Sequence, residues 1–294
     1  MEADERWTPA AHKLCLSMGI VLTILYLVGW VFLAKFIPVP SPDMPADQLA
    51  NWLAGHRNAY EAGCLFMLFA GGLLAPWGAS LTVWTRRAEG RLPVLHLCEL
   101  ATLAASVCIF VIIAIFWGLA GFRAGQIDPE ITQAFFDTGW FLFLWAGPCF
   151  YLWALSFGLA VIMNPPERQM FPRWVGFFTA ASVLCWAMGP LAIFFLSGSM
   201  NYGGALPTWI PVVEFFAWVV VVSVYGYRAI KTHEAMTLAT HGSAGIYKPG
   251  WDDPIVANGA AERYPTAIPT ELDSAAGEIL DVAVDHESRP ASVR

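Results

Sequence analysis

Residues 94–121 read VLHLCELATLAASVCIFVIIAIFWGLAG, and this stretch decides the fold class. It contains one acidic residue, Glu99, and one histidine, His96, but no lysine or arginine. A helix needs about 20 mostly apolar residues to cross the hydrocarbon core of a bilayer, so this stretch can span it and also tilt. In water it would expose a large apolar surface. We therefore predict a transmembrane helix here.

Five other stretches meet the same criterion, which predicts an all-α membrane protein with a bundle of six transmembrane helices. The composition agrees, because 57% of the residues are hydrophobic and only 13% are charged, whereas soluble domains carry about 25% charged residues. No stretch shows the alternation of about ten residues that is typical of a membrane β-barrel. The predicted spans are residues 15–37, 62–84, 94–121, 135–163, 174–197 and 209–230.

These spans divide the chain into an N-terminal segment (1–14), a transmembrane domain (15–232) and a C-terminal tail (233–294). The tail holds ten acidic and four basic residues, a balance of −6, while the whole chain has a formal charge of −7. It is rich in Gly, Pro and Ala with weak periodicity, so we expect it to be mostly disordered. Two roles are open for it: a simple solubilising tail, or a segment that docks a cytoplasmic protein partner.

The distribution of lysine and arginine in the short loops predicts the orientation. Nine of these residues fall on one side of the predicted spans and three on the other. The richer side is expected to be cytoplasmic, which places both termini in the cytoplasm of a bacterial cell with the spans in its inner membrane. The nine are Arg6, Lys13, Arg86, Arg87, Arg91, Arg168, Arg173, Arg228 and Lys231, and the three are Lys35, Arg57 and Arg123.

The loop between the first two spans begins with a proline-rich stretch at 38–45, which cannot be helical throughout. After it, Leu49, Trp52 and Leu53 recur at a helical spacing. This pattern favours a short amphipathic helix over 46–57 that lies in the outer membrane interface. A plain solvated loop is the alternative.

The second and fourth spans align without gaps at an offset of 76 residues. Ala70-Gly71 then matches Ala146-Gly147, and Trp77 matches Trp153. The same offset relates the third span to the fifth, so spans two to five have the pattern of a tandem repeated helical hairpin. Parallel repeats of this kind occur in transporters, with the site near their interface. They also occur in proteins that transport nothing.

Three acidic residues, Glu61, Asp137 and Glu214, mark the beginnings of the three spans that run from outside to inside. One interpretation is that the three carboxylates gather at the outer mouth of a cavity and attract a cation. The interpretation that we favour from the sequence is simpler. Each acid lies at a helix N-terminus, where the macrodipole and the free N–H groups stabilise negative charge without any ligand.

His96 and Glu99 lie three residues apart on one face of the third span, near its cytoplasmic end. An ionisable group at that depth costs several kcal/mol unless it is paired or hydrated. Two roles are equally open: a proton-handling pair, or a structural ion pair of the acid with Arg173 or an arginine of the 86–91 loop.

Prolines inside the predicted spans are the remaining notable pattern. Pro148 and Pro190 lie well within their spans, and each follows a glycine. Such a Gly-Pro pair interrupts the backbone hydrogen-bond ladder and frees carbonyl groups, which can create a hinge or line a cavity. A fixed kink for packing is the commoner use.

No motif predicts a cofactor, a metal site or a nucleic-acid partner. Only His96 of the six histidines lies within a span, which argues against membrane di-iron enzymes and bis-histidine haem. None of the six cysteines forms a C-x-x-C pair, so we interpret them as packing residues. No basic stripe suggests nucleic acid. These absences disfavour an enzyme and leave a carboxylate-based membrane enzyme as the third interpretation.

The stretch Phe171-Pro-Arg-Trp-Val-Gly-Phe177, the six-span layout and the sequence Arg86-Arg-Ala-Glu-Gly90 together resemble a group of uncharacterised bacterial six-helix membrane proteins. The resemblance covers about residues 10–232 and omits the tail. It implies the fold and the membrane location, and it carries no activity or functional residues.

Taken together, these patterns lead us to expect a polytopic protein that transports or binds a small apolar or cationic molecule. The site is expected in an aromatic-rich cavity between the repeated hairpins. The alternative is a non-catalytic membrane anchor or accessory subunit of a larger complex, in which the tail recruits a partner. The candidate ligand-binding residues are Glu61, Asp137, Glu214, Glu99 and His96.

Overall fold

The computed structural model describes residues 9–89, 92–145, 147–165 and 169–241. Six helical segments in this part of the chain are long and apolar enough to cross a membrane, as the sequence predicts. They are Pro9–Leu33, Arg57–Glu89, Val94–Phe122, Pro129–Met163, Arg173–Phe194 and Ala205–Glu234. The protein is therefore treated below as a multi-pass membrane protein.

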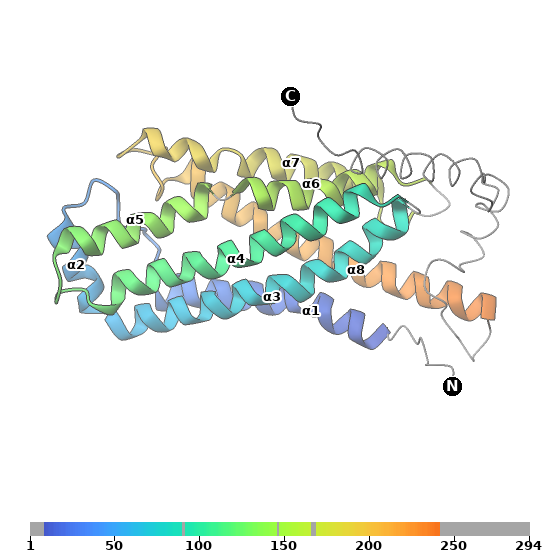
Figure 1. Ribbon diagram of the computed structural model, residues 1–294, viewed down its shortest axis with the longest axis horizontal. Helices are drawn as coiled ribbons and strands as arrows, with labels where there is room; N and C mark the ends of the chain where they lie inside the picture. Colours follow the sequence, from blue (N-terminus) through green and yellow to red (C-terminus); the bar gives the residue numbers. More distant parts are fainter. Residues whose placement is uncertain (1–8, 90–91, 146, 166–168, 242–294) are drawn as a thin grey trace, which may run out of the picture. The chain divides into compact units, whose positions relative to one another are not determined.

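The helices are drawn side by side in Figure 1. Their bounds are α1 (Pro9–Leu27), η1 (Val28–Leu33), α2 (Ala46–Gly55), α3 (Arg57–Glu89), α4 (Val94–Phe122), α5 (Pro129–Trp145), α6 (Gly147–Met163), α7 (Arg173–Trp186), η3 (Gly189–Phe194), η4 (Ala205–Trp209) and α8 (Ile210–His241). Residue 146, between α5 and α6, lies outside the described residues.

The spans pack as a closed ring in chain order. The helix α1 contacts α3, and α3 contacts α4. The fourth span, made of α5 and α6, follows on α4, then come α7 and α8, and α8 contacts α1. Contacts between α3 and α6 cross the middle of the ring. Backbone groups within such helices satisfy one another, which is why a ring of helices is stable in lipid.

The first and second spans approach each other closely through their backbones. A Cβ atom at Gly63 of α3 would lie 2.6 Å from the carbonyl oxygen of Gly29, so only glycine permits the contact between α3 and η1. Small residues at helix contacts are typical of membrane proteins, because lipid gives no hydrophobic drive for association and packing must supply it.

Three helical pieces depart from α geometry. Both η1 and η4 are π-helical, and η3 is a 3₁₀ helix. The fifth span was predicted as one helix over 174–197, but α7 ends at Trp186 and η3 begins at Gly189. The cause is Pro190, which has no N–H for the carbonyl of Trp186. The predicted interruption at Gly189-Pro190 is thus confirmed.

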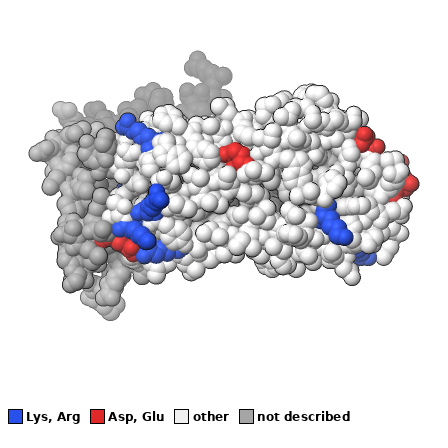
Figure 2. All heavy atoms as spheres, turned by 180° about the vertical axis from the view of Figure 1, so that it is seen from behind, with Lys and Arg blue, Asp and Glu red and all other residues white. Residues whose placement is uncertain are grey.

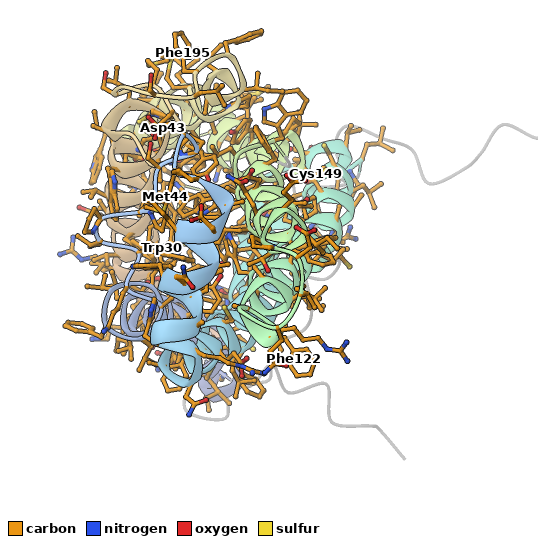
Figure 3. All side chains as sticks on the ribbon, turned by 90° about the vertical axis from the view of Figure 1, so that its left-hand side faces the viewer. Trp30, Asp43, Met44, Phe122, Cys149 and Phe195 are labelled. Atoms are coloured by element: carbon orange, nitrogen blue, oxygen red, sulfur yellow. The ribbon has the colours of Figure 1, made fainter. Side chains whose placement is uncertain are left out.

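The short helix predicted over 46–57 is present as α2, but its apolar face is turned to protein. Leu49 and Leu53 are buried, and α2 packs on α3, α4 and α5. Figure 3 looks along the bundle from this end, with Asp43 and Met44 on the segment that precedes α2. The amide of Gln133 donates to the Met44 carbonyl at 3.1 Å, which ties the segment to α5. The helix therefore caps one end of the bundle.

Charged side chains gather at the two ends of the bundle. Figure 2 shows an almost uncharged band between them, and more Lys and Arg at the end where α1 begins than at the end that carries α2. One ion pair at the α1 end joins Lys13 to Glu234 of α8 at 2.8 Å. An uncharged band between charged ends is the surface expected of a protein surrounded by lipid.

The end of the last span differs from the prediction. The disordered tail was placed at 233–294, yet α8 continues as a helix to His241. Tertiary contacts hold the first residues of this extension, because Glu234 pairs with Lys13 and His233 lies beside Arg87. Residues 242–294, to which the rest of that prediction applies, lie outside the described residues.

Candidate functional site

A cavity of about 80 Å³ lies inside the ring, and we call it the aromatic cavity. No charged residue lines it, and rings make up much of its wall. Its size is about half that of an engineered apolar cavity of ~150 Å³ that binds benzene. Its lining residues are Tyr26, Trp30, Ser106, Ile109, Phe110, Ile113, Phe143, Leu144, Gly147, Phe150, Tyr151, Trp186, Gly189, Pro207, Pro211, Val212, Phe215 and Phe216.

The irregular helical pieces converge on this cavity. Trp30 belongs to the π-helix η1, Pro207 to the π-helix η4, and Gly189 to the 3₁₀ helix η3, and all three line it. Short π and 3₁₀ segments within long helices are frequent at functional sites, because they redirect side chains and free backbone groups.

Three backbone carbonyls at the cavity lose their usual helical donor. Proline has no N–H, so Pro148, Pro190 and Pro211 leave the carbonyls of the residues four positions earlier without that bond. Those residues are Leu144, Trp186 and Pro207, and all of them line the cavity.

The carbonyl of Trp186 has found a replacement donor. The hydroxyl of Tyr151 on α6 donates to it at 2.7 Å. The other two carbonyls belong to Leu144 of α5 and to Pro207 of the π-helix η4. These two oxygens face Gly189, where a Cβ atom would lie 3.4 Å from the Pro207 oxygen and 3.6 Å from the Leu144 oxygen.

A tightly packed group of indoles lies next to the cavity, and we call it the tryptophan cluster. It consists of Trp77 on α3, Trp153 on α6 and Trp218 on α8, with ring centroids 5.4 to 5.7 Å apart. Trp218 also contacts Phe150 and Trp186 of the cavity wall, at 6.0 and 5.3 Å. The cluster therefore closes the cavity on one side.

The three acids predicted to share a site have separate partners. Glu61 pairs with Arg57 one turn earlier, at 2.8 Å. Asp137 accepts a hydrogen bond from the hydroxyl of Tyr202 at 2.7 Å. Glu214 accepts one from the hydroxyl of Ser182 on α7. None of the three, all of them in the described residues, lines the aromatic cavity.

The helix-terminus explanation for these acids is contradicted by the helix bounds. α3 begins at Arg57, α5 at Pro129, and the last span at Ala205 with η4. None of the three acids therefore falls in a first turn. The macrodipole falls off within one turn, so it does not account for their positions.

Glu99 and His96 do not form a pair either. Nδ1 of His96 lies 2.9 Å from the carbonyl oxygen of Thr82. Glu99 is fully buried, and neither of its carboxyl oxygens has a hydrogen-bond partner in the described residues. Its polar neighbours are Thr85 and Trp153. No arginine of the described residues therefore pairs with Glu99, and Arg91 of the 86–91 loop lies outside them.

Two titratable groups lie in the connections at the α2 end. Burial, and then the nearby Asp137, raise the pKa of Tyr202, so its hydroxyl stays protonated and donates. Burial lowers the pKa of His56, which sits 4.2 Å from the ring of Trp52. Tyr202 also stacks on Trp140 at 5.4 Å, which closes this end of the bundle with an aromatic layer.

Sequence reasoning found the breaks in the helices but missed the residues around them. The Gly147-Pro148 and Gly189-Pro190 pairs were identified as able to line a cavity, and both glycines do line it. Neither Trp30 nor Pro207 was predicted to line a cavity. Their roles depend on π-helical turns, for which the sequence gives no local signal.

No protein-family model matches the chain, and no curated protein or solved structure matches it. We therefore infer the function from the geometry of the aromatic cavity.

Proposed function

We propose that this protein binds a small, largely apolar molecule within the membrane, in the aromatic cavity. The supporting observation is a cavity of about 80 Å³ whose lining is uncharged and rich in rings. Pockets of this character bind ligands mainly through apolar contact, with a few polar groups that fix orientation. A charged ligand fits less well, because a charge at this depth needs a partner that the lining lacks.

Passage of the molecule across the membrane extends this proposal. The cavity lies where η1, η3 and η4 interrupt the regular helices, and such interruptions are the usual hinge points of membrane proteins. Movement of η3 relative to α7 would change the wall at Trp186 and Gly189. Transport and simple binding share the same site and differ only in whether this movement opens it on both sides.

The tandem hairpin is part of the same proposal. Trp77 and Trp153 occupy equivalent positions of the two proposed copies, and their rings meet at 5.6 Å across the contact between α3 and α6. Equivalent residues meet in this way when they lie near an axis that relates parallel repeats. That axis would pass through the tryptophan cluster, beside the cavity.

For the location, we propose a bacterial inner membrane with the Lys- and Arg-rich end in the cytoplasm. Lys13 lies near the start of α1, Arg87 near the end of α3 and Arg228 in the second half of α8, and such a bias marks cytoplasmic loops. Reporter fusions after residues 56 and 90 test this directly. Periplasmic activity from the first and cytoplasmic activity from the second are expected, and the reverse would overturn the orientation.

Binding is tested with fluorobenzene as the probe, on the full chain in lipid nanodiscs. Saturable broadening of its ¹⁹F NMR signal, above that of empty nanodiscs, is expected. Ile109→Trp fills the cavity from α4 and should weaken binding by at least about tenfold. The matched control is Ile112→Trp on the same helix, because Ile112 is 41% exposed and does not line the cavity.

Two results would contradict the proposal. One is the absence of saturable binding by the unmodified protein, and the other is equal binding by the Ile109→Trp variant. Without binding, recovery of a second protein in fixed stoichiometry would favour the accessory-subunit function, with residues 242–294, which follow α8, as the segment to delete.

A further inference from the structure

We infer that Glu99 is a proton-binding site inside the membrane, where its carboxyl group releases and takes back a proton beside Thr85 and Trp153. This inference goes beyond the binding of a ligand in the aromatic cavity and does not depend on it. Its basis is the meeting of three buried polar side chains from α3, α4 and α6. None of the three has a hydrogen-bond partner in the described residues.

Thr85 departs from the usual behaviour of hydroxyl groups in these spans. The hydroxyls of Thr82 and Ser156 each donate to a backbone carbonyl of their own helix, three or four residues earlier. Thr85 is just as deeply buried, but its hydroxyl has no partner in the described residues. It lies beside the carboxyl of Glu99. Its O–H is therefore available to a carboxylate at that position.

Trp153 is the same kind of exception among the indoles of the tryptophan cluster. The indoles of Trp77 and Trp218 each donate to a hydroxyl group. The indole of Trp153 is fully buried and has no acceptor in the described part of the chain. It approaches the Glu99 carboxyl from α6. An indole N–H only donates, so a carboxylate oxygen is the partner that it suits there.

Two unused donors beside one buried carboxyl favour a change of protonation state. When the O–H bond of the Glu99 carboxyl breaks, its electron pair stays on the oxygen and the proton passes to water. Each donor can then bond to the carboxylate, and hydrogen bonds to a charged group are stronger than neutral ones. These bonds offset the cost of a buried charge. When the proton returns, the carboxyl is neutral and the donors are released, as the described side chains show.

A second, smaller cavity gives the proton a path toward the surface. Its volume is about 10 Å³, and its lining includes Thr85, Arg87 and Asn164. This volume is close to what a single water molecule needs. Arg87 is partly exposed, near the end of α3. Thr85 is thus common to the cavity and to the Glu99 carboxyl, and a water in the cavity can carry the proton between them and solvent.

The charged groups around the site do not pair with Glu99. Glu89, at the end of α3, accepts two backbone N–H groups from the start of α4 and repels a negative charge at Glu99. His96, one turn earlier on α4, lies against a backbone carbonyl of α3. Neither Arg86 nor Arg87 reaches the carboxyl. α6 has no charged residue, and the acids of α5 belong to the α2 end of the bundle.

A metal ion is the other positive partner that a buried carboxylate can take. Metal ions such as Ca²⁺ need several oxygen ligands. The described residues contain no group of three or more His, Cys, Asp or Glu side chains that could share a metal ion. The N–H of Trp153 would also point its positive end at the cation. A proton therefore fits the site better than a metal ion.

The test is infrared spectroscopy of the full chain in lipid nanodiscs during a pH titration. A protonated carboxyl in apolar surroundings gives a C=O stretching band separate from those of carboxyls in water. We expect such a band to disappear as the pH is raised and to return as it is lowered, and Glu99→Gln should remove it. Glu214→Gln is the matched control and should keep this band, because Glu214 also lies within a span and has one oxygen without a partner.

Variants of Thr85 test the donor. Thr85→Val removes the hydroxyl at nearly constant volume and should move the midpoint of the titration to higher pH by about one unit, because the carboxylate loses a hydrogen bond. Thr85→Ser keeps a hydroxyl and should restore the midpoint. Thr82→Val is the control on the same helix and should leave the midpoint unchanged, since the Thr82 hydroxyl donates to its own helix.

The inference is overturned if no such band exists, if the band survives in Glu99→Gln, or if no change of pH removes it. A midpoint that moves with Na⁺ concentration at constant ionic strength would also overturn it, because a cation would then compete for the carboxylate. Where Glu99→Gln does not fold, the Thr85 variants decide, and equal midpoints in Thr85→Val and the unmodified protein would count against the site.

Discussion

The tryptophan cluster and the aromatic cavity are neighbouring regions built from the same kinds of residue, yet they differ in how their polar groups are satisfied. In the cluster, the indole of Trp77 donates to Ser223 at 3.0 Å and that of Trp218 donates to Thr179 at 2.9 Å. The described part of the cavity wall has three buried polar groups without a hydrogen-bond partner, the indoles of Trp30 and Trp186 and the hydroxyl of Tyr26, whereas in the cluster the indole of Trp153 alone lacks one. The first region is filled, and the second is hollow.

The difference follows from the helices that carry the rings. The cluster sits on the α-helices α3, α6 and α8, which keep α geometry there even though Pro76 precedes Trp77 in α3. The cavity sits where η1, η3 and η4 replace regular turns. In lipid, irregular backbone is tolerated only when it is buried in protein or lines a cavity. An interruption in a span is therefore a better guide to a binding site than the abundance of aromatic residues.

The largest effect on stability is expected from a substitution in the tryptophan cluster. Trp77→Ala removes a fully buried indole from the cluster and should lower the free energy of unfolding by about 3–5 kcal/mol. Trp174→Ala is the control, since Trp174 is 47% exposed and should cost much less. Unfolding by SDS in mixed micelles, followed by circular dichroism, measures both. Equal losses would mean that the cluster is not the stable part of the bundle.

Glu99 lies beside Trp153 of the tryptophan cluster, and its buried carboxyl has no hydrogen-bond partner in the described residues. Glu99→Leu should raise the free energy of unfolding by about 1–3 kcal/mol, because it removes a buried polar group that has no partner. Glu61→Leu should change it by less than about 1 kcal/mol, because Glu61 forms a partly exposed ion pair. A loss of stability in Glu99→Leu would show that the carboxyl binds a partner, and the filled region would then contain a second site.

Removal of the Tyr151 hydroxyl should make the cavity wall less stable. Tyr151→Phe leaves the carbonyl of Trp186 without a donor and should lower the free energy of unfolding by about 1–2 kcal/mol. The same change at Tyr225, which keeps its ring contact with Trp174, should have little effect. If Tyr151→Phe is neutral, the carbonyl of Trp186 does not depend on this donor, and the hydrogen bond does not stabilise the cavity wall.

The smallest effect compares one serine from each region. Ser223→Ala removes the acceptor of the Trp77 indole and should cost about 1 kcal/mol of stability. Ser106→Ala in the cavity wall should be within about 0.5 kcal/mol of neutral, because that hydroxyl donates only to Thr102 of its own helix. Equal losses of stability in Ser223→Ala and Ser106→Ala would mean that the tryptophan cluster and the cavity wall do not differ in how far hydrogen bonds stabilise them.

Much of the architecture follows from local sequence. The six spans, the short helix α2 and the break at Gly189-Pro190 depend on hydrophobic runs and on proline, whose effects reach only a few residues along the chain. The helical periodicity at Leu49 and Leu53 predicted α2 for the same reason. What it left undecided was whether that face met lipid or protein, and the packing of α2 on three other helices decided this.

The sequence by itself therefore determined a six-span membrane protein with breaks at defined prolines, because a bilayer admits few ways to bury a run of apolar residues. The tertiary structure alone decided the partners of the polar groups. Asp137 meets Tyr202, Glu214 meets Ser182, and the carbonyls of Leu144 and Pro207 meet at Gly189. Asp137 and Tyr202 are 65 positions apart in the chain, and Glu214 and Ser182 are 32 positions apart. Only the packing of the helices, which no local pattern specifies, brings them together.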